Sequence, residues 1–269
     1  IMEWSRFRDI FIDELIRLDG LGWQSSPMVC ALPLCGKEGL YRCLDCFNSS
    51  VVCSGCMCAT HQCHPLHRIE FWTGDFWQKS SLHLLGLIVP LGHNGGVCPS
   101  SPSTTNLTII DISGIHTVSV NFCDCDSVCL PHRNQLLRVR WWPATVDRPQ
   151  TVATFTALDT FLQLSLQSKL NMYDFYLSMV HLTDNAGVQN LKERYKEWLR
   201  CVREFRHAHT AKRSACGHDP GGVQATQSGE CAVECPACPQ PGRNLPEGWE
   251  NSPSCQSYSD NTAFTGGGL

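Results

Sequence analysis

Apolar residues at three- and four-residue intervals predict several helices along the chain. Near the N-terminus this spacing predicts a helix over residues 4–18, which Gly20 would end. In the second half it predicts helices over 154–169 and 171–181. The clearest apolar stripe runs over 188–205 and predicts a third helix there, with a mixed charged opposite face. The region from residue 151 onward is therefore expected to be helical.

Alternating apolar residues predict a β-rich region in the middle of the chain. Residues 107–112 and 115–122 are two β-rich runs joined by Ser113 and Gly114, which is typical of a hairpin. In residues 136–142, apolar side chains alternate with arginines and predict a third strand. The Pro/Ser/Thr-rich residues 97–106 before the hairpin are expected to form a loop.

Cysteine and histidine pairs dominate residues 30–67, which read C-x4-C-x7-C-x2-C-x6-C-x2-C-x4-H-x5-H. Tetrahedral zinc needs four soft or borderline ligands, which proteins usually supply as short-spaced pairs. Four pairs in a row predict two zinc ions in an interleaved, cross-brace arrangement. The first ion would take Cys30, Cys35, Cys53 and Cys56, and the second Cys43, Cys46, His61 and His67.

Three further residues in this run could replace a neighbour as ligand: Cys58, Cys63 and His64. We favour His61 and His67 because a terminal histidine pair completes the count. The alternative is a disulfide framework in a secreted domain, or cysteines packed as small apolar residues. We expect no secretory signal, and a disulfide framework needs no C-x2-C pairs ending in histidines.

A third zinc site is predicted where the hairpin ends. Cys123 and Cys125 form a chelating step, and His93 and Cys98 precede them as a second pair. Cys129 and His132 are competing ligands for this site.

Residues 235–238 form a further half-site, with Cys235 and Cys238 as the ligands. Its nearest candidate partners are Cys216, His218 and Cys231, and the alternative is a reduced C-x2-C turn without metal. Cys201 lies on the apolar side of the last predicted helix and is expected in the core, whereas Cys255 falls in the tail.

Composition limits the functions that the chain can have. Its 269 residues carry 18 cysteines and a net charge of −4, which argues against a strongly basic nucleic-acid arm over the whole chain. The charged face of the last predicted helix has a local basic excess, which is either a solvated surface or one that faces DNA. We find no membrane-spanning run and no phosphate-binding glycine loop, and we cannot assemble a carboxylate metal site from the scattered aspartates. We expect an intracellular, nuclear protein with no catalytic residues.

The expected fold class is α+β: a small zinc-stapled cross-brace module plus a short antiparallel sheet, followed by a helical segment and a disordered C-terminal tail. The predicted organisation is an N-terminal helix (1–24), a double-zinc module (25–80), a β-rich segment with the third zinc site (81–150), a helical segment (151–213), a Gly/Pro-rich CPACP segment (214–250) and the tail (251–269).

A resemblance to a known family rests on several short sequence motifs that occur in the same order. Among them are YRCLDC, LGLIVPLGH, LTIIDISGIHTVSVNFCDC, QLLRVRWWPAT, RYKEWLR and AVECPACPQPG. From Arg8 to Trp249 the chain resembles the cysteine-cluster region on the N-terminal side of KDZ (Kyakuja–Dileera–Zisupton) transposases. The family pattern matches six of the ligands predicted from spacing: Cys43, Cys46, Cys53, Cys56, His61 and His67.

The resemblance implies a mobile-element protein that binds zinc, and DNA or a partner protein in transposition. In the family an RNase-H-like catalytic domain follows the NLP segment, but this chain ends soon after Trp249. We therefore interpret it as a truncated, non-catalytic recognition region. The alternative is a zinc-dependent protein-interaction module of the B-box type with no link to DNA; its oligomeric state is not predicted.

Overall fold

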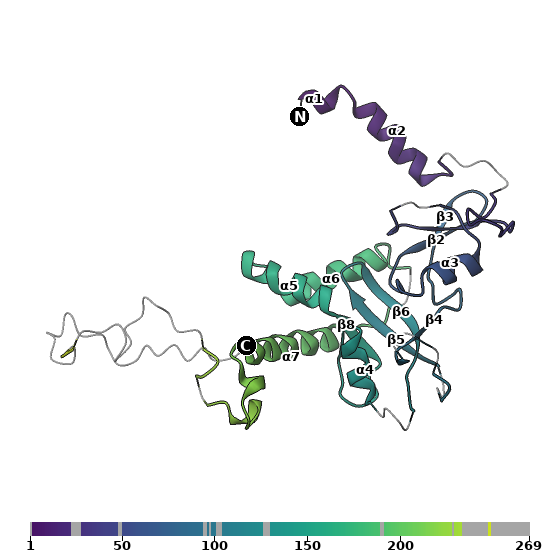
Figure 1. Cartoon of the computed structure of the whole chain (residues 1–269). Helices are drawn as coiled ribbons and strands as arrows, with labels where there is room; N and C mark the ends of the chain where they lie inside the picture. The colour runs from purple at the N-terminus through teal and green to yellow at the C-terminus, as the bar shows by residue number, and fades with distance from the viewer. Residues whose placement is uncertain are drawn as a thin grey trace. The chain divides into compact units, whose positions relative to one another are not determined.

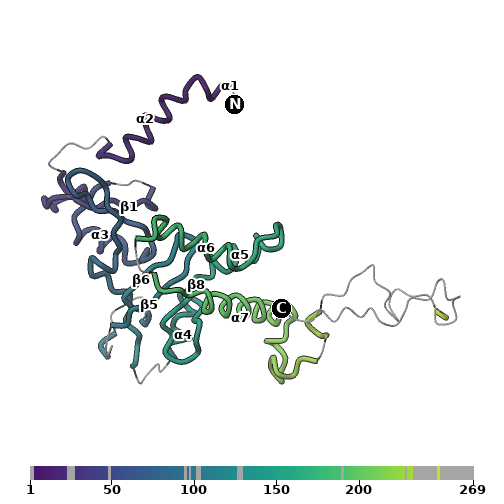
Figure 2. The backbone as a smooth tube through the Cα atoms, turned by 180° about the vertical axis from the view of Figure 1, so that it is seen from behind, coloured from purple at the N-terminus to yellow at the C-terminus, as the bar shows by residue number. Residues whose placement is uncertain are grey.

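A computed structural model describes residues 2–22, 28–47, 50–93, 96, 98–100, 104–125, 130–188, 191–227, 229–232 and 247–248. The chain divides into two compact units, Ile1–Cys201 and Val202–Leu269. The boundary falls within helix α7 (Tyr195–Arg213), which is drawn as one continuous helix in Figures 1 and 2. The predicted disordered tail, residues 251–269, lies outside the described residues. The α+β fold class is confirmed.

Two helices stand at the N-terminus where the sequence predicts one. They are α1 (Met2–Ser5) and α2 (Arg8–Asp19). The apolar side chains of α2 are exposed rather than buried, and Leu15 is 63% exposed. Hydrogen bonds hold the end of the helix, since Arg42 donates to the carbonyl of Leu18 and the Trp77 indole donates to that of Gly20 at 2.7 Å.

A small three-stranded antiparallel sheet follows, in the order β1-β2-β3. Its strands are β1 (Tyr41–Cys43), β2 (Ile69–Trp72) and β3 (Trp77–Ser80), and helix α3 (Ser54–Thr60) lies between β1 and β2 in the chain. Met57 and Ile69 are each 1% exposed and form the centre of this module together with the buried cysteines. With so few apolar side chains, the core of this module is too small to hold it without further cross-links.

The larger sheet has five strands in the order β4-β6-β5-β8-β7. They are β4 (Ile88–Pro90), β5 (Thr104–Asp111), β6 (Gly114–Asn121), β7 (Trp141–Pro143) and β8 (Thr151–Thr154). The predicted hairpin is confirmed as β5 and β6, and Gly114 takes the positive φ of 137° that its turn requires. The sheet is mixed, because β4 pairs with β6 and β8 with β5 in parallel.

Both faces of this sheet are buried. Leu107, Ile109 and Val120 point to one face, where Leu136 of α4 (His132–Arg138) joins their cluster. Ile110 directly follows Ile109 in β5, so its side chain points to the other face of the sheet, where it is fully buried. There α5 (Phe155–Gln167) contacts β8 and α6 (Met172–Thr183) contacts β6 (Figure 1).

The strand predicted over 136–142 is wrong for its first half, which belongs to α4. The helix begins after Pro131, and the buried side chain of Gln135 bonds the backbone of Cys123 and Leu130. Arg140, at a φ of +62°, lies in the turn between the end of α4 at Arg138 and the start of β7 at Trp141. These long-range bonds override the local alternation of apolar residues.

The helices after residue 151 agree with the sequence except at their ends. Thr151–Thr154 form a strand, after which the Thr154 hydroxyl accepts a hydrogen bond from the N–H of Ala157 and caps α5. Asn171 caps α6 in the same way. The helix predicted over 188–205 is instead α7 (Tyr195–Arg213), because Gly187, at a φ of +67°, makes a turn there and Val188 is exposed. Two short turns of 3-10 helix follow, η3 (Cys216–His218) and η4 (Val223–Ala225).

Candidate metal centres

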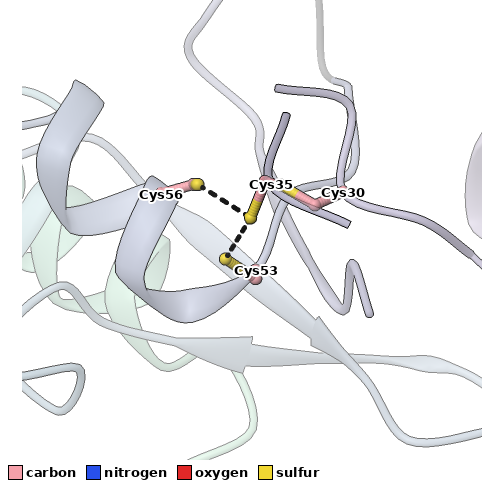
Figure 3. Close-up of side chains that lie close together, drawn as sticks. All are labelled: Cys30, Cys35, Cys53 and Cys56. Atoms are coloured by element: carbon pink, nitrogen blue, oxygen red, sulfur yellow. Dashed lines mark hydrogen bonds between the residues drawn. The ribbon is translucent and has the colours of Figure 1, made fainter. Parts of the chain in front are cut away.

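The first predicted ligand set comes together in the small module. Cys30 and Cys35 lie on the loop before β1, Cys53 is the N-cap of α3, and Cys56 lies in the first turn of that helix (Figure 3). The loop reverses at Leu34, with a φ of 65° and a fully exposed side chain, and at Gly36, with a φ of 62°. This tight turn brings the two loop thiols to face the start of α3.

The sulfur separations in this first quartet are those of a metal site. The Sγ atoms of Cys35 and Cys53 are 3.6 Å apart, and those of Cys35 and Cys56 are 3.5 Å apart. Zn–S bonds of about 2.3 Å at tetrahedral angles put neighbouring sulfurs about 3.8 Å apart. A disulfide needs about 2.05 Å. The cysteines are free thiols in an arrangement that closely fits one tetrahedral ion.

The second predicted set also comes together, as Cys43, Cys46, His61 and His67. His61 Nε2 lies 3.4 Å from Cys46 Sγ, and His67 Nδ1 lies 3.5 Å from the sulfurs of both Cys43 and Cys46. A tetrahedral ion with bonds of about 2.0 Å to nitrogen and 2.3 Å to sulfur would hold such atoms about 3.5–3.6 Å apart. With the first quartet, this reproduces the interleaved pairing expected from spacing.

His61 is oriented as a metal ligand requires. It is 5% exposed, and its Nδ1 lies 3.0 Å from the carbonyl of Met57 one turn earlier, so that Nε2 faces Cys46. A ligating histidine usually donates its other ring N–H to such a carbonyl, which fixes the tautomer. Burial lowers the pKa of His61 and favours the neutral imidazole that binds metal.

An ion pair braces the same centre. The Arg68 guanidinium donates to both carboxylate oxygens of Asp45, at 2.6 Å for the shortest bond, and its backbone N–H donates to the carboxylate as well. Asp45 precedes Cys46 and Arg68 follows His67, so the pair ties the two ends of the ligand set together. Although burial opposes it, this bonding to Arg68 holds the pKa of Asp45 below its usual value.

The third set, His93, Cys98, Cys123 and Cys125, meets at the end of the larger sheet. His93 Nε2 lies 3.3 Å from the sulfurs of both Cys123 and Cys125, and Cys98 Sγ lies 3.3 Å from Cys125 Sγ. These ligands come from the segment after β4 and from the end of β6. The competing His132 stacks on Phe122 and lies 3.2 Å from the carboxylate of Asp124, and Cys129 lies outside the described residues.

Two residues that sequence reasoning missed shape this third centre. Gly92 approaches Cys123 so closely that a Cβ at position 92 would lie 2.3 Å from the Cys123 Cβ. Gln135 of α4 bonds both the N–H and the carbonyl of Cys123, at 2.9 and 2.8 Å. The sequence signal for Gly92 is its position directly before His93, a candidate metal ligand.

The pKa values of the thiols within the quartets differ strongly from one cysteine to the next. Hydrogen bonding to Cys53 raises the pKa of Cys56 to about 12, while the N–H of Cys56 helps lower the pKa of Cys53 to about 7. Burial raises the pKa of Cys43 to about 11. Neighbouring thiolates repel one another, so all of them ionise together only around a cation. The donor sets therefore match a divalent metal ion.

The alternative ligands of the first run stay outside the quartets. The thiol of Cys58 donates to the carbonyl of Leu85, Cys63 is exposed, and the His64 ring stacks on that of His67 at 4.7 Å between centroids. Cys201 is fully buried, as expected of a core residue.

The last half-site, Cys235 and Cys238, lies outside the described residues. Of its candidate partners, Cys216 and Cys231 approach each other, with Sγ atoms 3.5 Å apart. His218 follows Cys216 in η3 and is exposed.

A cavity of about 730 Å³ lies between the second and third centres. Leu66, Val89, Leu91 and Trp141 make its apolar lining, and Arg138 contributes a charge. Each neighbouring quartet already offers four protein ligands. An ion held by all four protein ligands would have no open position for a water nucleophile, as in structural zinc sites.

Comparison with family models matches residues 82–187 to a family described as CxC2 like cysteine cluster associated with KDZ transposases. The match covers the larger sheet and the third quartet and confirms the resemblance for that segment, whereas the first two quartets precede it. Comparisons with curated proteins and with solved structures found no match. Among the described residues, no helix combines the length and apolar character needed to cross a bilayer.

Proposed function

We propose that this chain is a zinc-stapled, non-catalytic recognition region of a KDZ-type transposase, which binds element DNA or a partner protein in transposition. The match of residues 82–187 to a cysteine cluster associated with these transposases supports the connection. On this proposal the protein acts in the nucleus.

One observation carries the proposal: three sets of four ligand atoms converge, and within each set all atoms lie within 4.8 Å of one another. Together they offer nine thiols and three imidazoles and no carboxylate. Zinc is the common ion that prefers tetrahedral sulfur and nitrogen sets. We therefore propose three zinc ions per chain, each with a stabilising role.

Duplex DNA binding tests the recognition role. The zinc-loaded chain is titrated into a fluorescent duplex of mixed sequence at several salt concentrations, and anisotropy is read. Phosphate contacts release counterions, so the logarithm of the affinity should fall linearly with that of the salt concentration. An affinity that does not change with salt, or no binding at all, would remove DNA from the proposal and leave the assembly role.

The second candidate function is a B-box-like protein-interaction module. The interleaved quartets of residues 30–67 favour it, because they lie before the segment that matches the transposase-associated family. This reading predicts no salt-dependent DNA affinity in the same titration.

A further inference from the structure

One helix concentrates positive charge in an acidic chain. Helix α7 carries six lysines and arginines and two glutamates in 19 residues, a net charge of +4. The other 250 residues carry 15 lysines and arginines and 23 aspartates and glutamates, a net charge of −8. A merely solvated surface requires no such separation of charge.

Four basic residues of α7 form one stripe. Lys196, Arg200, Arg203 and His207 are all exposed and recur at intervals of four, three and four residues, which places them on the same side of the helix. From Lys196 to His207 the helix rises about 16.5 Å, at about 1.5 Å per residue.

The other side of α7 is fixed in the fold. Trp198 and Phe205 are fully buried, and Trp198 stacks on Phe175 at 5.5 Å between ring centroids. Arg200 also donates to the carbonyl of Ala144 at 3.1 Å. The basic stripe is therefore presented on a helix that cannot easily rotate. Within the described part of the chain, none of the ion pairs neutralises Lys196 or Arg203.

We infer that this stripe on α7 is the surface that contacts the phosphates of duplex DNA. Successive basic residues are spaced about 4.5–6 Å along the helix axis, close to one or two base-pair steps of about 3.4 Å. A membrane surface fits less well, because a helix that binds lipid must expose apolar side chains opposite its basic face, and here they are buried. The inference deepens the proposed function and rests on its DNA-binding branch.

The test is a double neutralisation, Lys196→Gln with Arg203→Gln, in the zinc-loaded full chain. Arg200 is left intact because its hydrogen bond to Ala144 has a structural role. The matched control removes one lysine and one arginine charge from exposed positions elsewhere: Arg6→Gln and Lys169→Gln. Circular dichroism and zinc content should stay unchanged in both variants, since each altered side chain is exposed.

Each lost phosphate contact should reduce the salt slope by about 0.9, so the slope should fall by about 1.8 in the double variant. At about 0.1 M salt this is roughly an eightfold loss per contact, or about sixtyfold in all. The control should keep the wild-type slope, because long-range charge alone is screened within about 10 Å.

Three results would overturn the inference. If wild type binds DNA and the stripe variant keeps its slope, the surface lies elsewhere and the proposed function stands. If wild type does not bind duplex DNA, the DNA branch itself fails. If the stripe instead drives salt-sensitive self-association in sedimentation velocity, or binds anionic vesicles as tightly as DNA, the partner is a second copy or a lipid surface.

Discussion

Replacing Gly92 by alanine tests how the third centre is built. The added Cβ would lie 2.3 Å from the Cβ of Cys123, 3.3 Å from its sulfur and 3.5 Å from its Cα. Carbon atoms pack best at about 3.5–4.0 Å, so the closest pair is too near by more than about 1 Å. Neither Cβ can rotate away, because each is fixed to its backbone.

The backbone segments at positions 92 and 123 must therefore separate. Overpacking of this kind typically costs about 1–3 kcal/mol of stability. The separation also displaces His93 from Cys123, two members of one quartet whose ligand atoms lie 3.3 Å apart. Changes to groups that support metal ligands commonly weaken metal binding by about 10–100-fold.

Chelator competition with atomic-absorption counting measures the effect. Wild type should release its ions at high chelator concentration, and Gly92→Ala should release one ion at a concentration at least about tenfold lower. The control is Gly55→Ala, a glycine of α3 beside Cys56 that has open space around its Cβ position. If Gly92→Ala and wild type gave the same competition curve, the close approach at Gly92 would not support a metal centre.

Four further substitutions probe the centres and the packing around the larger sheet. Cys53→Ser should lose one ion per chain, whereas Cys58→Ser should keep all of them, because the Cys58 thiol instead bonds a carbonyl; equal metal counts would contradict this assignment. Thr154→Val removes the cap of α5 and a 2.6 Å bond to a buried carboxylate, and should cost about 1–3 kcal/mol in urea unfolding; a loss below about 0.5 kcal/mol would disprove it. Tyr176→Phe leaves the N–H of Arg194 without its 2.7 Å partner and should cost about 1–2 kcal/mol by the same assay, with an unchanged metal count; a neutral effect would mean that water replaces the hydroxyl.

The metal-ligand sets could be predicted from the sequence because the two members of each chelating pair lie close together in the chain. Cys53 and Cys56, three residues apart, must meet the same ion, so counting pairs and applying tetrahedral geometry left few combinations. The structure brings together each of the three quartets that this reasoning selected. The hairpin was predictable for a similar reason, since two alternating runs around Gly114 specify their own partner.

Other features depend on contacts that local sequence does not encode. Helix α4 forms where alternation indicated a strand, because the Gln135 side chain bonds the backbone of Cys123 twelve residues earlier. The parallel pairs β4–β6 and β8–β5 join segments separated by other elements, so apolar spacing could not assign them. The apolar residues of α2 followed a helical period correctly, yet they are exposed.

Zinc X-ray absorption on the purified, zinc-loaded chain, with metal counted on the same sample, tests the central claim most directly. The quartets predict three ions per chain, with average shells of three sulfurs at about 2.3 Å and one nitrogen at about 2.0 Å. Two or fewer ions per chain, or shells dominated by oxygen, would contradict the account.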